Sequence, residues 1–201
     1  MTSFSGKRIG IYAGTFDPVH AGHIGFALQA MEFAGLDRIY FLPERRPRTK
    51  PGVEHFAHRV AMVKRACRPY PYFKVMELVD VSFSTERTLP KLLKEFDGAQ
   101  LAFLFGSDVI AHLPSWPNVQ RLLKTAELVI GVRSDQDQTS LQQQISAWKD
   151  QPVAVTMFES YAADVSSGKI REGLRDKKSV PGLLHSVAHY SNRNWLYVTV
   201  K

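Results

Sequence analysis

Two histidines three residues apart, His20 and His23, offer the clearest chemistry in this sequence, at the end of the stretch GTFDPVHAGH. The stretch follows the apolar run 9–13 and leads into a helical spacing of apolar residues, which is typical of a strand-to-helix turn. One imidazole would then lie in the loop and the other in the first helical turn, so both could donate toward one point. The N–H groups of the helix start face the same point, which favours an anion such as a phosphate. The alternative is a loop in which the histidines only cap the helix or pack.

The glycines of this turn also suit a phosphate. Gly14 lets the backbone pass close to a ligand, and Gly22 leaves room beside the helix start. In an open parallel sheet, ligands bind beyond the carboxyl ends of the strands, which is where this turn would lie. We therefore expect the turn to form one side of a phosphate-binding site.

A second polar group comes directly after the apolar run 100–105, where Gly106 and Asp108 stand. Because parallel strands end at one edge of the sheet, Asp108 would face the same ligand as the first turn. Its carboxylate could accept hydrogen bonds from ribose hydroxyls or cap the helix that follows, and the residues alone leave both open. Trp116, in a loop with flanking prolines, could stack on a base or a pyridine ring, or could cover the core.

A third group stands late in the chain, in the stretch DVSSGKIREGL. Ser166 or Ser167 is a natural N-cap for a helix. Arg171 lies near the start of that helix, where the positive end of the dipole disfavours a cation unless an anion shares the space. The two hydroxyls, the helix start and the guanidinium would form a second phosphate cradle.

The elements that must position these groups alternate between strand and helix patterns. Strands are expected at 9–13, 38–42, 73–76, 100–105, 127–132 and 153–158, and helices at 24–34, 55–67, 88–96, 118–124, 139–149, 167–174 and 182–190. This alternation predicts an α/β fold with a doubly wound, mostly parallel sheet. We expect a single domain over residues 1–201, with a small helical C-terminal part from about residue 165.

The composition narrows the class of protein. A chain of 201 residues with 44 % apolar residues is typical of a soluble globular protein. No apolar run reaches membrane-spanning length, and the N-terminus lacks the apolar core of a signal peptide, so we expect a cytoplasmic protein without membrane contact. The single cysteine, Cys67, excludes an internal disulfide and a cysteine-based zinc site.

The net charge of +7 favours an anionic partner, which could be nucleic acid, a membrane surface or a polyanionic small molecule. The basic residues are spread along the chain, and no RNA-binding motif interleaves them with aromatic residues. Nucleic acid is therefore the less favoured partner. The one dense basic cluster could attract an acidic substrate or could be a solvated loop; it comprises Arg45, Arg46, Arg48 and Lys50.

These three groups, in this order, resemble the nucleotidylyltransferase superfamily, whose signature is a T/HxGH motif. Within the superfamily, the stretch GTFDPVHAGH most resembles the corresponding motif of bacterial nicotinate mononucleotide adenylyltransferases. The segment from Gly106 to Trp116 is similar to the GxD…PxW arrangement of that family. The stretch SSGKIR resembles its ISSTxIR motif, with Gly168 in place of Thr. The likeness covers nearly the whole chain and predicts a Rossmann-like nucleotide-binding core.

Softer matches and two departures accompany these motifs. His58, Arg59 and Met62 resemble an HRxxM helix of the family. The segment SFSTERTL stands where the family has SYTxxTL, and PERRPRTK stands where it has PxxxPPHK. Both departures fall on the side of the acceptor substrate, so the sequence leaves open whether nicotinate or nicotinamide mononucleotide is used.

The resemblance implies transfer of the adenylyl group of ATP to the phosphate of such a mononucleotide, in NAD biosynthesis. It implies catalytic roles for His20, His23 and Arg171. ATP would be bound by Gly14, Thr15, Phe16, Gly22, Gly106, Asp108, Ser166 and Ser167. The acceptor would contact Thr85, Trp116 and Arg46. Mg²⁺ would arrive with ATP, and no metal ion is expected to be held by the protein alone.

The sequence leaves two other functions open. The chain could be an adenylyl- or cytidylyltransferase for another phosphate monoester, such as phosphopantetheine. It could also be a non-catalytic nucleotide- or RNA-binding protein on the same fold. The partners expected are ATP and a mononucleotide, and a homo-oligomer is compatible with the sequence, which does not reveal the oligomeric state.

Overall fold

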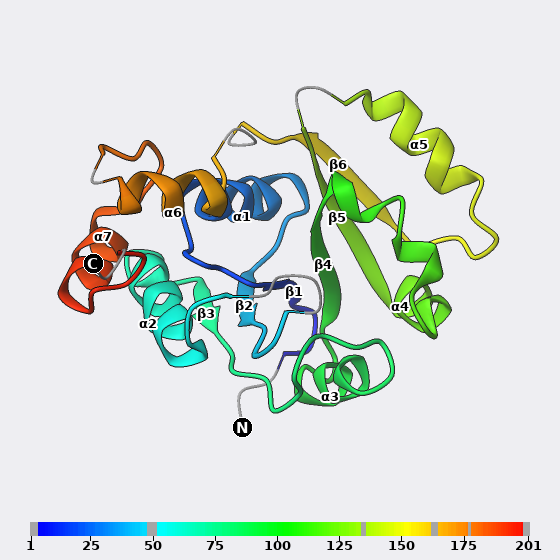
Figure 1. The fold of residues 1–201 in the computed structure, drawn as a ribbon. Helices are drawn as coiled ribbons and strands as arrows, with labels where there is room; N and C mark the ends of the chain where they lie inside the picture. Colours follow the sequence, from blue (N-terminus) through cyan, green and yellow to red (C-terminus); the bar gives the residue numbers. More distant parts are fainter. Residues whose placement is uncertain (1–3, 48–51, 134–135, 162–164, 177, 199–201) are drawn as a thin grey trace.

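The fold is built on a six-stranded sheet, seen in a computed structural model that describes residues 4–47, 52–133, 136–161, 165–176 and 178–198 (Figure 1). The strands lie in the order β3-β2-β1-β4-β5-β6, and every neighbouring pair is parallel. This is the strand order of a Rossmann-like, doubly wound sheet, as the alternating pattern predicted. The strands are β1 Arg8–Gly14, β2 Arg38–Pro43, β3 Phe73–Val75, β4 Gln100–Gly106, β5 Ala126–Val132 and β6 Val155–Glu159.

The helices cover both faces of the sheet. They are α1 Ala21–Phe33, α2 Phe56–Cys67, α3 Thr88–Glu95, α4 Val119–Thr125, α5 Gln138–Ser146, α6 Ser167–Arg175 and α7 His185–Arg193. Buried side chains of α1, α2 and α7 pack in one core cluster, and those of α3, α4 and α5 pack in the other (Figure 1). The expected helices are all present, and two short 3-10 turns that the sequence did not predict, Ser107–Val109 and Leu113–Ser115, follow β4.

Strand β4 shows why its apolar run is continuous. Phe103 and Phe105 point into one core cluster, whereas Ala102 and Leu104 point into the other. Successive side chains of a strand alternate between the two faces, so a strand covered by helices on both faces must be apolar throughout. The central position of β4 places the end of this strand, and the polar residues after it, beside the end of β1.

The C-terminal part packs against the body of the fold. Helix α7 lies along α2, where the Tyr190 hydroxyl is 2.9 Å from Nδ1 of His58 and the Arg65 guanidinium lies 4.1 Å from the centroid of the Tyr190 ring. This helix begins at His185 and not at Gly182, because Gly182 adopts a left-handed φ of 81° in the turn before it. The packing supports the expected single domain with a helical C-terminal part, which stays a prediction.

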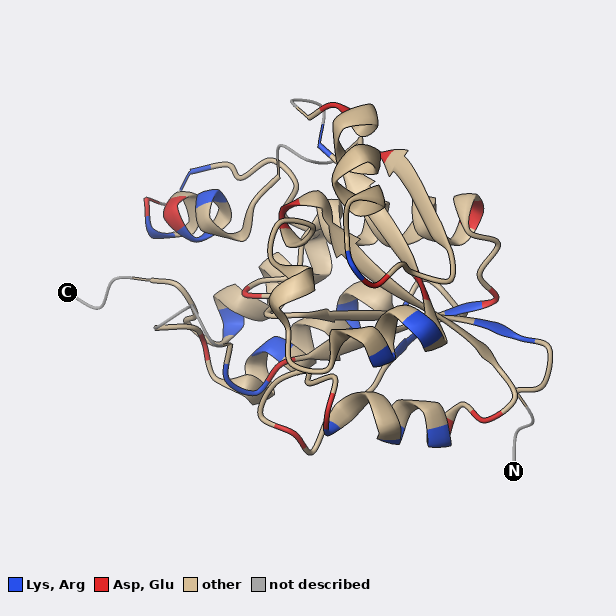
Figure 2. Cartoon of the chain, turned by 90° about the vertical axis from the view of Figure 1, so that its right-hand side faces the viewer, with Lys and Arg blue, Asp and Glu red and all other residues tan. Residues whose placement is uncertain are grey.

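Charge is distributed over many elements. Figure 2 shows Lys and Arg on several helices and loops, with Asp and Glu among them. None of the helices within the described ranges combines the length and the apolar character needed to cross a membrane.

Candidate active site

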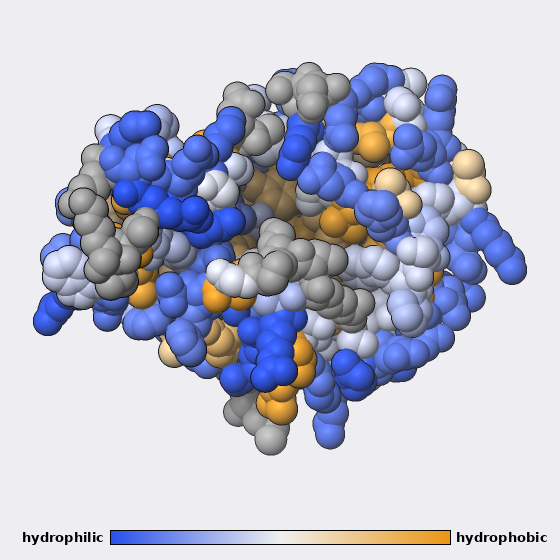
Figure 3. All heavy atoms as spheres, in the orientation of Figure 1, coloured by the Kyte–Doolittle hydropathy of each residue, from blue (hydrophilic) through white to orange (hydrophobic). Residues whose placement is uncertain are grey.

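The site lies where β1 and β4 end side by side and their connections leave in different directions. β1 continues into the loop before α1, and β4 continues into the 3-10 turn Ser107–Val109. This is the topological switch point at which open α/β sheets bind ligands. Two adjoining cavities of about 470 and 530 Å³ open there, and Figure 3 shows a hollow near the middle of this face. Both cavities are lined by Tyr12, His23, Gly106, Asp108, Ser167 and Arg171.

The two histidines are held against each other at the start of α1. His20 is the extended residue before the helix, with φ −144° and ψ 174°, and its main-chain N–H donates to Nδ1 of His23 over 3.2 Å. The ring centroids lie 3.7 Å apart. Because Nδ1 of His23 accepts a hydrogen bond, the proton of this ring sits on Nε2. His23 lines both cavities, so it presents a donor-bearing ring to a ligand there.

His20 differs from its neighbour in burial. Its side chain is only 6 % exposed, and burial lowers the pKa of the imidazole to about 4, so the ring is neutral near pH 7. Nδ1 of His20 is buried and has no hydrogen-bond partner within the part of the chain that the structure describes. Buried ring nitrogens are rarely left unpaired, and exceptions are typical of binding sites. His20 lines the larger of the two cavities.

The late stretch reaches the first loop directly. Ser166 is the N-cap of α6, and its Oγ accepts the Lys169 N–H over 3.2 Å. Ser167 Oγ donates to the Pro18 carbonyl over 2.9 Å, and Nη1 of Arg171 donates to the Asp17 carbonyl over 2.6 Å. The start of α6 and the turn before α1, about 150 residues apart in sequence, therefore border one cavity from two sides.

The residues expected around ATP lie at these cavities with different degrees of exposure. Gly14, Thr15 and Phe16 line the smaller cavity, and Gly22 the larger, while Gly106 lines both. The Phe16 ring is 2 % exposed, and a Cβ added to Gly14 would lie 2.9 Å from it, so Gly14 permits this packing. Asp108 does not cap a helix; its carboxylate forms an ion pair of 2.9 Å with Arg133, which follows β5.

A third cavity of about 520 Å³ adjoins the first at Ala13, Gly14 and Thr15. It contains the expected acceptor residues Thr85 and Trp116. Trp116 is half-buried and lies edge-on to Phe105, with ring centroids 5.9 Å apart, so it covers the core and also lines the cavity. Thr85 is buried, and its hydroxyl donates to the Pro117 carbonyl.

In the basic loop after β2, the side chains of Arg45 and Arg46 lie in different surroundings. Arg45 donates from Nε to the Leu78 carbonyl over 2.9 Å and lies over the Phe56 ring, 4.4 Å from its centroid. Arg46 is exposed and does not line the third cavity, although its main-chain N–H donates to Val81. Arg48 and Lys50 lie outside the described residues.

In the sequence, Arg59 stands out only as part of the HRxxM pattern of a helix. In the structure, its side chain connects two loops of the site. It is fully buried, and its guanidinium donates to the carbonyls of Glu54, Thr15 and Arg45 over 2.9, 2.7 and 3.0 Å. It thereby ties the first loop to the loop after β2. A sequence signal existed in the spacing of His58, Arg59 and Met62, but nothing in that spacing shows which loops the side chain meets.

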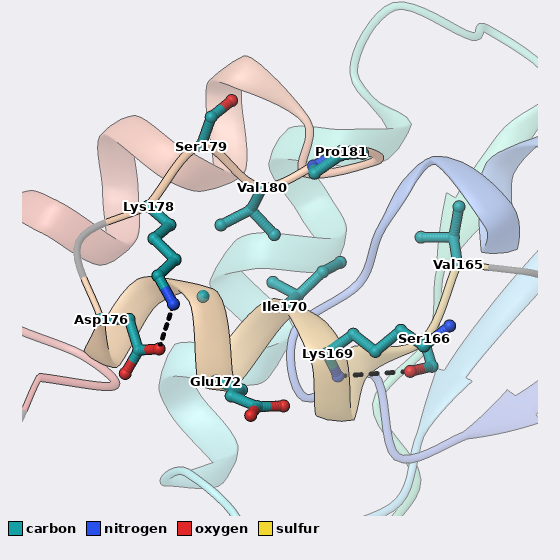
Figure 4. A pocket seen from close by; sticks show the side chains of 11 residues that line it. Val165, Ser166, Lys169, Ile170, Glu172, Asp176, Lys178, Ser179, Val180 and Pro181 are labelled. Atoms are coloured by element: carbon teal, nitrogen blue, oxygen red, sulfur yellow. Dashed lines mark hydrogen bonds and ion pairs between the residues drawn. The ribbon is translucent and has the colours of Figure 1, made fainter.

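A separate hollow lies on another side of α6 (Figure 4). It has a volume of about 440 Å³, and Ile170 and Val180 form part of its apolar wall. Ser166 lines both this hollow and the larger site cavity, whereas Arg171 lines only the site cavities. Among the described residues, no group of three or more His, Cys, Asp or Glu side chains could jointly hold a metal ion.

Comparison with known proteins agrees with this architecture. A family model described as cytidylyltransferase-like matches residues 11–173. The nicotinate-nucleotide adenylyltransferase of Bacillus subtilis is 33 % identical over 198 residues, which cover 95 % of this chain and 98 % of that protein. A probable nicotinate-nucleotide adenylyltransferase of Clostridium perfringens is 30 % identical over 197 residues, covering 92 % and 97 %. The Plasmodium falciparum nicotinic acid mononucleotide adenylyltransferase complexed with NaAD has the same fold, with a TM-score of 0.79 at 19 % identity over 95 % of this chain and 97 % of that one.

Proposed function

This chain belongs to the cytidylyltransferase-like family, and from that premise we propose that it transfers the adenylyl group of ATP to the phosphate of a pyridine mononucleotide, in NAD biosynthesis. One relative named above is a nicotinate-nucleotide adenylyltransferase and the other a probable one, so nicotinate mononucleotide is the first acceptor to consider. Nicotinamide mononucleotide is the second, because the departures SFSTERTL and PERRPRTK fall on the acceptor side.

The reaction needs no protein nucleophile. An oxygen of the mononucleotide phosphate attacks the α-phosphorus of ATP in line, and the bond from that phosphorus to the oxygen bridging to the β-phosphate breaks. Pyrophosphate leaves with the electron pair of that bond, and the product is a dinucleotide. The protein then contributes by positioning the two substrates and by stabilising the negative charge that develops.

The observation that carries this proposal is the meeting of the two phosphate-binding segments. The side chains of Ser167 and Arg171 in α6 donate hydrogen bonds to the main-chain carbonyls of Pro18 and Asp17 in the first loop, so both segments face one cavity. In the proposal, the N–H groups at the start of α6 and the Arg171 guanidinium hold the β- and γ-phosphates. His23 donates from Nε2 to the reacting phosphate. His20, neutral and buried beside it, keeps the His23 ring in place and borders the same cavity.

The remaining expected residues complete the two substrate positions. Gly14, Thr15, Phe16, Gly22, Gly106 and Asp108 border ATP, which enters as its Mg²⁺ complex. Trp116 and Thr85 border the pyridine nucleotide in the adjoining cavity, which meets the ATP cavity at Gly14 and Thr15. Arg46, exposed outside that cavity, would attract the anionic acceptor by its charge and not by contact.

A panel of acceptors tests the proposal. The purified chain is incubated with ATP and Mg²⁺ and with nicotinate mononucleotide, nicotinamide mononucleotide or phosphopantetheine, and dinucleotide and pyrophosphate are measured by mass and by a coupled assay. We expect a dinucleotide from at least one pyridine mononucleotide. A product from phosphopantetheine alone would identify a different acceptor. Binding of RNA with a steep salt dependence and no turnover would contradict an enzymatic role.

A further inference from the structure

The C-terminal segment reaches the first loop through one side chain. The Tyr197 hydroxyl donates to Oδ1 of Asp17 over 2.7 Å, although 180 residues separate the two. Tyr197 lies after α7, in the stretch that follows the last helix. Asp17 belongs to the turn between β1 and α1 and lines the smaller site cavity.

Asp17 is almost completely enclosed. It is 2 % exposed, and its Oδ1 also accepts the Glu54 N–H over 3.3 Å. A buried carboxylate needs such donors, because an unpaired charge in the interior is strongly disfavoured. Among the residues that the structure describes, Tyr197 and Glu54 donate the two hydrogen bonds to this side chain, and both help to fix its orientation.

Asp17 also holds the Arg171 side chain in position. Nη1 of Arg171 donates to the Asp17 carbonyl over 2.6 Å and lies 3.8 Å from Oδ2 of its carboxylate. Arg171 is about one-third exposed toward the cavity. A change in the position of Asp17 would thus move the guanidinium that faces the ligand. The contacts form a chain from Tyr197 through Asp17 to Arg171.

The backbone around Tyr197 is unusual in a way that fits this role. Trp195 and Tyr197 both have left-handed backbones, with φ of 54° and 63°, a conformation that residues other than glycine rarely adopt. Such residues persist where the surrounding structure demands them, often beside functional sites. Burial, together with the nearby Asp17 carboxylate, raises the pKa of Tyr197, so its hydroxyl stays protonated and remains a donor.

We propose that Tyr197 is a positioning residue for ATP: its hydroxyl holds Asp17, which seats Arg171 against the triphosphate. The C-terminal segment is then part of the ATP site, although no atom of it belongs to the three sequence motifs. This inference rests on the proposed function, because it takes the ligand of Arg171 to be the phosphates of ATP.

The test compares two variants, each of which lacks the hydroxyl of one tyrosine. Tyr197→Phe removes the bond to Asp17. Tyr190→Phe is the matched control, since Tyr190 is also half-buried in the C-terminal part, and neither it nor His58, which its hydroxyl meets, lines the site cavities. We expect Tyr197→Phe to lower kcat/KM for ATP about tenfold, the size of a lost charge-assisted hydrogen bond, with KM for the mononucleotide unchanged. Tyr190→Phe should keep wild-type kinetics.

A double-mutant cycle separates positioning from general stability. In an Arg171→Lys background, Tyr197→Phe should have little further effect on kcat/KM for ATP, because the group that it positions is already gone. Thermal denaturation of all variants checks that they are folded at the assay temperature. Wild-type ATP kinetics in Tyr197→Phe, an equal loss in Tyr190→Phe, or full additivity with Arg171→Lys would each overturn the inference.

Equilibrium binding of ATP distinguishes this inference from the proposed function. If the wild-type chain makes no dinucleotide but Tyr197→Phe still raises the Kd for ATP about tenfold, the proposed function fails and the positioning role stands. If the wild-type chain is active and Tyr197→Phe binds ATP as tightly as wild type, the positioning role fails alone.

Discussion

His20 donates its main-chain N–H to the Nδ1 atom of His23, so the backbone of one histidine sets the tautomer of the other. The two residues are three apart, which is the spacing from the residue before a helix to its third position. The bond therefore has two effects. It satisfies a free N–H at the start of α1, and it leaves the proton of His23 on Nε2.

Two substitutions at His23 separate these effects. His23→Asn retains a short side-chain oxygen that can accept the His20 N–H, but it removes the donor that Nε2 provides. We expect turnover to fall by about 10²–10³, as when one donor to a developing oxyanion is lost, while the free energy of unfolding changes little. His23→Ala removes both functions and should also lower the free energy of unfolding by about 1 kcal/mol.

Pyrophosphate release and urea unfolding measure the two quantities on the same preparations. The assignment of His23 is wrong if His23→Asn turns over at nearly the wild-type rate. A loss of turnover that appears only in His23→Ala, together with the loss of stability, would show that the ring serves the helix and not the reaction.

The sheet and its helices were predictable because their signals are local. The run 100–105 is apolar on both faces, and the helical spacings repeat within each segment. The placement of the first two motifs at one edge followed from the positions of their strands, since parallel strands end together. The two 3-10 turns after β4 were missed because a three-residue turn has no periodicity to detect.

Contacts between distant loops carried no such signal. Arg59 meets carbonyls from two loops, the one before α1 and the one between β2 and α2, and a carbonyl is the same in every residue. The bond from Tyr197 to Asp17 depends on two left-handed residues near the C-terminus that are Trp and Tyr, not the Gly or Asn that would suggest such a backbone. Arg45 and Arg46 look equivalent in the sequence, and both are exposed residues outside the third cavity, yet the Arg45 guanidinium lies over the Phe56 ring.

Replacement of Arg59 should damage both stability and activity. Arg59→Met keeps much of the apolar stem but leaves three carbonyls without their donor, so we expect the free energy of unfolding to fall by about 3 kcal/mol. Turnover should fall as well, because Thr15 loses the contact that holds it at the cavity. Urea unfolding and kinetics measure both effects.

Arg65→Met is the matched control for Arg59→Met, because Arg65 is exposed and its guanidinium donates to Ala61 within the same helix. The control should lose less than about 1 kcal/mol and keep its turnover. Equal losses in the two variants would show that any arginine of α2 has this effect and that the three carbonyl contacts are not decisive.

Gly168 offers a gain-of-function test. A Cβ at this position would meet nothing nearer than Ser166 Oγ at 3.9 Å, and Gly168 lines the larger site cavity. Gly168→Thr would supply the hydroxyl that the related motif ISSTxIR carries. We expect its KM for ATP to lie about threefold below that of Gly168→Ala, the effect of one added neutral hydrogen bond.

Gly168→Ala controls for the backbone. Both substitutions remove a flexible glycine from α6, so any gain in stability that comes from helix propensity should appear in the alanine variant as well. If Gly168→Thr has a higher KM for ATP than Gly168→Ala, the side chain obstructs the cavity, and the start of α6 does not hold the triphosphate in the proposed way.

The burial of His20 predicts a specific dependence of stability on pH. Its pKa is about 4 in the folded chain, against about 6.5 for an unfolded histidine. Between these values the unfolded chain binds a proton that the folded chain does not, so the free energy of unfolding must fall as the pH drops from 6.5 toward 4. For a shift of this size, the loss from His20 amounts to about 3 kcal/mol.

His20→Gln isolates this contribution from that of the carboxylates, which also titrate at low pH. Urea unfolding of both proteins at several pH values gives the difference in their free energies of unfolding. We expect wild type to lose stability relative to His20→Gln by about 3 kcal/mol as the pH falls through this window. Parallel curves would mean that the pKa of His20 is the same in the folded and the unfolded chain, so that the ring gains its proton at about pH 6.5 in both. In that case burial would not keep the ring neutral at lower pH, and the neutral role proposed for it beside His23 would hold only above about pH 6.5.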